Sequence, residues 1–147
     1  MIAALVAAVL LQAMSQEQMI LEGEKIGRAA AALGFCAGFG YTIDQEAAEH
    51  WGEDFGERAI MAGWSEAVVI EAIQSGTAAE MADINPPAVD PGLTDAEFVA
   101  EVTTFVEHMK ARCRSLQVET PDLIRDIEAG DRSADEMLAT IVRARSE

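Results

Sequence analysis

The sequence predicts an all-α protein, a single-domain bundle of five or six helices that carries one disulfide. Three observations support this fold class. Half of the 147 residues are hydrophobic but only 5% are aromatic, so the core must consist mainly of aliphatic side chains and Met. Apolar residues recur at helical intervals of three and four through most of the chain. No segment alternates apolar and polar residues over five or more positions, as a half-buried strand does.

The N-terminal segment predicts export of the protein. Residues 2–14 form an apolar run interrupted only by Gln12, and polar residues follow from Ser15. This run has the length of a signal-peptide core and is shorter than the about 20 residues that span a bilayer. We therefore expect a signal peptide at 1–15 and a helical domain at 16–147, periplasmic or secreted. Because no Lys or Arg precedes the run, an uncleaved membrane anchor and a buried first helix are the alternatives.

Regular spacing predicts the first helix within residues 17–33, where small or apolar residues recur at intervals of three and four. The glycines that follow predict a tight turn that places Cys36. These glycines are Gly34, Gly38 and Gly40.

Two further helices are predicted before the middle of the chain. The pattern at residues 42–45 is typical of a capping box and predicts the start of the second helix, which Gly63 ends. Ser65 predicts the N-cap of the third helix, in which Gly76 either ends the helix or weakens it. The buried stripe of the second helix is predicted to comprise Ile43, Ala47, Trp51, Phe55, Ala59 and Ala62.

The second half contains the most regular helical pattern. Pro and Gly residues make residues 84–93 a loop, and Thr94 and Glu97 form a second capping box. The apolar residues that follow occupy one helical face, which turns Cys113 inward. They are Phe98, Val102, Phe105, Met109, Cys113 and Leu116.

The remaining chain predicts two short helices. Pro121 suits the first turn of one helix, and Gly130 should stop it. Ser133 and Glu136 form a third capping box and predict the start of the last helix.

Cys36 and Cys113 are the two cysteines of the chain, and export to an oxidising compartment predicts a disulfide between them. Closing a loop of this length stabilises a fold by about 4 to 5 kcal/mol in the chain-entropy model. Two buried free thiols are the alternative if the protein is cytosolic.

The charge distribution indicates the kind of partner. A net charge of −16 disfavours nucleic acids and anionic membranes. Residues 44–107 carry fifteen acidic residues and one basic residue. A candidate binding face, which we call the acidic face, lies on the second helix; the alternative is a surface that only keeps the protein soluble. The acidic face comprises Glu46, Glu49, His50, Glu53, Asp54 and Glu57.

These observations predict an exported, non-enzymatic protein that binds a basic protein partner through the acidic face. An acid-activated periplasmic holdase chaperone is the alternative, because many carboxylates surround a small helical core. A thiol or metal activity is a lesser alternative: Arg112 and Arg114 flank Cys113, and His50 lies between acids at helical spacing.

Complete sets of catalytic or metal-binding residues are missing from the sequence, so we expect no enzyme activity and no cofactor or metal. We also expect no nucleic-acid partner, and membrane contact only through an uncleaved N-terminal segment. The sequence does not indicate the oligomeric state.

Overall fold

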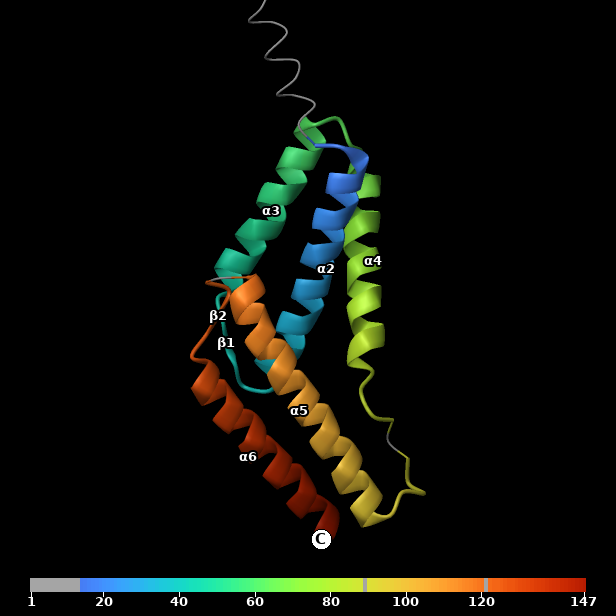
Figure 1. Cartoon of the computed structure of the whole chain (residues 1–147), viewed down its shortest axis with the longest axis vertical. Helices are drawn as coiled ribbons and strands as arrows, with labels where there is room; N and C mark the ends of the chain where they lie inside the picture. Colours follow the sequence, from blue (N-terminus) through green and yellow to red (C-terminus); the bar gives the residue numbers. More distant parts are fainter. Residues whose placement is uncertain (1–13, 89, 121) are drawn as a thin grey trace, which may run out of the picture.

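The computed structural model describes residues 14–88, 90–120 and 122–147. Within these residues the all-α prediction is confirmed, with five helices and one pair of two-residue strands (Figure 1). Figure 1 shows α2 between α3 and α4 at one end of the molecule, and α5 beside α6 at the other. The helices are α2 (Gln16–Gly38), α3 (Gln45–Met61), α4 (Glu66–Ile84), α5 (Asp95–Glu119) and α6 (Ile127–Ser146). The strands β1 (Thr42–Ile43) and β2 (Ile124–Arg125) pair antiparallel.

The predicted signal peptide lies outside the described residues except for Met14 and Ser15. Ser15 is the N-cap of α2, and it exchanges hydrogen bonds with Gln18 in a capping box. Cleavage after Ser15, the predicted site, therefore removes the residue that caps the first helix of the domain.

Two clusters of buried residues form the core, and α2 contributes to both. The smaller cluster joins the first half of α2 to α3 and α4, and it contains Met19, Ile26, Phe55, Ala59, Val69 and Ala72. The larger cluster surrounds the two cysteines and joins the second half of α2 to α5, α6 and the strands. The two clusters share one helix, which is why the chain forms a single domain.

Gly76 lies within α4 and does not end it. Because Gly76 has no side chain, α4 packs closely against α2 at this position. A Cβ atom at Gly76 would lie 2.0 Å from the carbonyl oxygen of Glu24, and one at Gly27 would lie 1.9 Å from that of Ile73. The Thr77 hydroxyl donates to the Gly27 carbonyl oxygen at 3.3 Å across the same contact. Glycines at both positions let the two backbones approach closely.

The predicted turn around Cys36 and the predicted start of α3 were both wrong. Gly34 and Gly38 belong to α2, and the chain turns at Gly40, whose φ is +94°. Residues 42–43 form β1 instead of a cap, because they pair with β2. Asp44 caps α3 by accepting from the Ala47 amide at 3.0 Å. Sequence spacing alone could not reveal this pairing, because β1 and β2 lie far apart in the sequence.

The caps at Ser65 and Thr94 and the end of α3 near Gly63 are confirmed. The predictions of a helix that ends at Gly130 and of a cap at Ser133 were wrong, because α6 contains both residues. A Cβ atom at Gly130 would lie 2.0 Å from Cδ1 of Tyr41. Gly130 is therefore a packing position for the Tyr41 ring within α6. Pro121, the predicted start of that helix, lies outside the described residues, and β2 lies within the predicted range of the helix.

Tyr41 and Arg114 hold Asp131 at the start of α6. The Tyr41 hydroxyl donates to Oδ1 of Asp131 at 2.5 Å, and Arg114 forms an ion pair with Oδ2. Burial raises the pKa of Asp131, but the bonds from Tyr41 and Arg114 outweigh this effect and hold the pKa below its usual value. Burial and the hydrogen bond to Asp131 raise the pKa of Tyr41.

We expect Asp131→Asn to lower the free energy of unfolding at neutral pH by about 1 to 2 kcal/mol. The folded-state pKa of Asp131 is depressed, so its stabilisation is present above the unfolded-state pKa and is lost as pH falls through the folded-state pKa. We expect urea unfolding to show that the difference in free energy of unfolding between wild type and variant is smaller at acidic pH than at neutral pH. Glu136→Gln, an exposed change on α6, is the control. An equal difference at both pH values would contradict the prediction.

Candidate functional site

The residues of the acidic face all lie exposed on α3, on the side away from the core. The opposite side of α3 buries Phe55 and Ala59, and Trp51 is half-buried. The predicted stripe thus packs inward, and the acidic side chains meet solvent.

Most of the charge on the acidic face is not neutralised within the protein. Arg58, the basic residue of α3, pairs with Asp54 at 3.0 Å and also with Glu22 of α2. Oε1 of Glu49 accepts from the amide of Gln45 at 3.0 Å, which does not change its charge. Within the described residues, four carboxylates of the face have no Lys, Arg or His nitrogen within 4.0 Å. These are Glu46, Glu49, Glu53 and Glu57.

A cleft of about 370 Å³ adjoins the acidic face. Its α3 wall includes His50, Trp51 and Asp54, and its opposite wall includes Asp122 and Leu123. Asp122 has a φ of +74°, a left-handed conformation that is uncommon for a residue other than glycine. The cleft therefore combines two carboxylates with an indole ring, a set that can hold a guanidinium or ammonium group.

The sequence did not reveal the part played by Asp122 and Leu123. They lie far from α3 in the chain, and the pairing of β1 with β2 brings them to it: the Asp44 amide donates to the carbonyl of Leu123 at 2.9 Å. Neither residue lies in a pattern from which this contact could be predicted.

Cys36 and Cys113 form the predicted disulfide, with their Cα atoms 5.8 Å apart. Neither cysteine is a free thiol. The two arginines that flank Cys113 are engaged elsewhere, Arg112 with Glu80 and Arg114 with Asp131. The structure therefore lacks the free thiolate that the thiol alternative requires.

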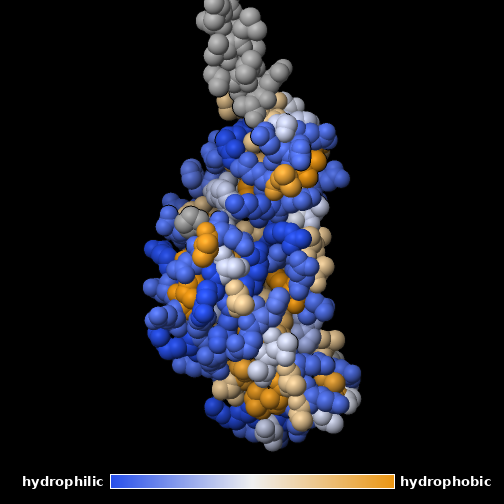
Figure 2. Space-filling model, in the orientation of Figure 1, coloured by the Kyte–Doolittle hydropathy of each residue, from blue (hydrophilic) through white to orange (hydrophobic). Residues whose placement is uncertain are grey.

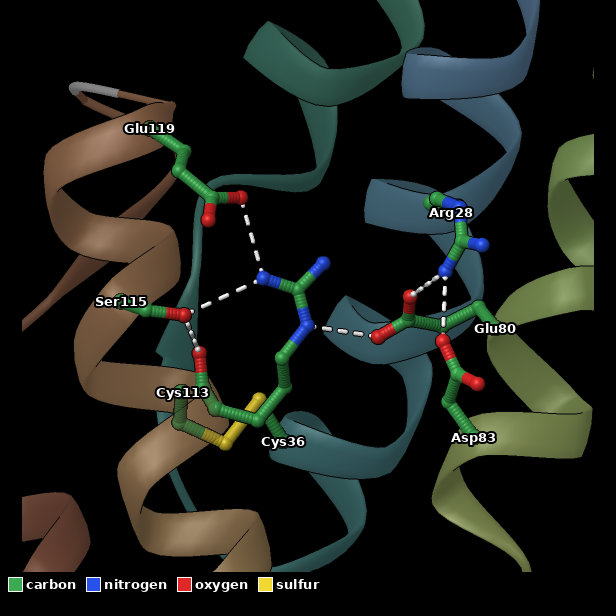
Figure 3. Close-up of polar contacts among 8 residues, drawn as sticks. Arg28, Cys36, Glu80, Asp83, Cys113, Ser115 and Glu119 are labelled. Carbon is green, nitrogen blue, oxygen red and sulfur yellow. Dashed lines mark hydrogen bonds and ion pairs between the residues drawn. A yellow bond between two sulfur atoms is a disulfide. The ribbon is translucent and has the colours of Figure 1, made fainter.

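A buried carboxylate next to the disulfide joins three helices (Figure 3). The side chain of Glu80 on α4 is 3% exposed and accepts from Arg28 of α2 at 3.2 Å and from Nε of Arg112 of α5 at 2.6 Å. Asp83 pairs with Arg28 at 2.8 Å and Glu119 with Arg112 at 3.0 Å. We call these five residues the Glu80 network. All its charges are paired, which is typical of a structural element and not of a reactive centre.

Within the described ranges, no three His, Cys, Asp or Glu residues are grouped to hold a metal ion. None of the helices in the described part of the chain has both the length and the hydropathy to cross a membrane. Comparisons with protein-family models, curated proteins and solved structures give no match to this chain.

Proposed function

We propose that this chain is an exported, non-enzymatic binding protein that contacts a basic protein partner through the acidic face. The observation that carries this proposal is the set of four exposed glutamates on α3 without a basic partner among the described residues, next to a cleft walled by Trp51. The disulfide supports export, because such bonds are typical of proteins from oxidising compartments.

The geometry suggests how the partner is held. Carboxylates spaced three and four residues apart on α3 repel one another, and a cationic surface relieves this repulsion. An Arg side chain of the partner enters the cleft, pairs with Asp122 and lies against the Trp51 ring. Attraction between opposite surface charges accelerates association and weakens as salt is added.

The test uses a defined cationic probe, a peptide in which Arg alternates with Gly. The binding variant carries Glu46→Gln, Glu49→Gln, Glu53→Gln and Glu57→Gln. The control carries Glu66→Gln, Glu71→Gln, Glu128→Gln and Glu136→Gln, four exposed positions on other helices. Both variants have the same net charge, so they separate the acidic face from the overall field of the protein.

We expect the binding variant to lose affinity for the peptide by about tenfold or more, because exposed charge pairs contribute up to about 1 kcal/mol each. The control should bind nearly as wild type does. With Trp64→Phe in every protein, Trp51 is the only tryptophan, and its fluorescence should change on binding. Two outcomes would rule out the acidic face as the binding surface. One is an equal loss of affinity in both variants, and the other is an affinity that stays constant when salt is raised from about 0.15 M to about 1 M.

Export has its own readout, the intact mass of the protein isolated from its native host. The proposal expects loss of residues 1–15, and a full-length mass would contradict it. The alternative function, an acid-activated chaperone, stays a prediction of the sequence.

A further inference from the structure

An apolar cavity of about 310 Å³ lies beneath the loop that joins α4 to α5, away from the acidic face. It is lined by Phe98 and Phe105 of α5, Met137 and Ile141 of α6, and Pro87 of the loop. Hydrophobic residues also gather on the surface near the lower end of the molecule, whereas hydrophilic residues cover most of the visible face (Figure 2). An apolar cavity of about 150 Å³ suffices to bind benzene, so this one has room for a ring or a medium alkyl chain.

A second, more open cleft of about 590 Å³ adjoins the cavity. Both hollows are lined by Pro87, Glu101 and Phe105, and the cleft adds Asp83 and His108. A molecule that enters both hollows therefore places its apolar part in the cavity and meets carboxylates in the cleft.

Charge decides which polar group fits the cleft. Asp83 already pairs with Arg28 at 2.8 Å, whereas the side chain of Glu101, on α5, forms no hydrogen bond or ion pair with the described residues. Glu101 is thus the carboxylate open to a ligand, and a cation complements it.

Arg145 lies at the Phe98 side of the cavity and is itself paired. Its guanidinium lies 4.8 Å from the centre of the Phe98 ring, donates to the Leu93 carbonyl at 2.8 Å and pairs with Asp95 at 3.1 Å. These contacts tie the end of the loop to α6, and the charge of Arg145 is paired with that of Asp95 at the Phe98 side of the cavity. The carboxylate of Glu101, and not the paired Asp95, therefore attracts a cationic head group.

The geometry points to a binding site for a small amphipathic amine, with its apolar body in the cavity and its ammonium group against Glu101. The volume of the cavity matches pockets for small molecules, which begin at about 300 Å³. An apolar body also gains van der Waals contacts with the aromatic and aliphatic walls of the cavity.

Three probes with the same alkyl chain test the site: octylammonium, octanol and octanoate. Each is titrated by calorimetry below the concentration at which it aggregates. We expect octylammonium to bind most tightly and octanoate least. Glu101→Gln, a change at an exposed position, should weaken octylammonium by about threefold to fivefold and leave octanol unchanged.

Two tryptophan variants test the cavity itself. Ile141→Trp fills it and should abolish binding of all three probes, whereas Val118→Trp, at a position 82% exposed, should not. The glutamine variant of the acidic face should bind octylammonium as wild type does, which separates this site from the proposed partner surface. The inference is overturned if no probe saturates, if all three bind equally, or if Glu101→Gln leaves the preference for octylammonium intact.

Discussion

Replacing both cysteines by alanine is expected to lower the free energy of unfolding by about 4 to 5 kcal/mol. The disulfide joins residues separated by 77 positions, so it removes much of the conformational freedom of the unfolded chain. Both sulfurs lie in the larger core cluster, where each cysteine is 0% exposed. Small domains are stable by about 5 to 15 kcal/mol, so this loss is a large share of the total.

Urea unfolding of the oxidised wild type and of the Cys36→Ala, Cys113→Ala variant measures this loss. Reductant provides the matched control: it should destabilise the wild type and leave the variant unchanged. Intact masses before and after reduction should differ by two hydrogens in the wild type alone. A loss below about 1 kcal/mol would show that the bridge contributes little beyond the packing around it.

Glu80→Gln is expected to lower the free energy of unfolding by about 3 to 5 kcal/mol, the usual cost of removing one member of a buried charge pair. The carboxylate of Glu80 is 3% exposed and faces guanidinium groups from two helices. Its removal leaves Arg112, whose side chain is 19% exposed, with Glu119 as its remaining ion-pair partner among the described residues. Three helices lose their common polar contact.

Thermal and urea unfolding should separate this effect from a general effect of charge. Glu71→Gln, an exposed change on the same helix, is the control and should shift stability by less than about 0.5 kcal/mol. A double-mutant cycle of Glu80→Gln with Arg112→Gln isolates the pair energy. If Glu80→Gln behaves like Glu71→Gln, the Glu80 network does not hold the helices together.

The fold class and the disulfide could be predicted because both depend on local patterns. The spacing from Phe98 to Leu116 places six residues on one face of α5, and four of them are buried while Phe98 and Phe105 are half-buried. That face turns Cys113 toward Cys36. The helical spacing and the presence of two cysteines were therefore enough to predict the disulfide. The acidic face was also predictable, because carboxylates at helical spacing lie together on any helix.

The sequence by itself determined where α4 and α5 begin, because Ser65 and Thr94 satisfy free amides within their own first turns. Tertiary structure decided the roles of Gly76 and Gly130, which local rules interpret as helix ends. Each glycine instead admits a neighbour, the α2 backbone or the Tyr41 ring, and the packing gained there outweighs the low helix propensity of glycine. Glu80 and the Trp51 cleft likewise depend on residues distant in the chain, and only the folded molecule brings those residues together.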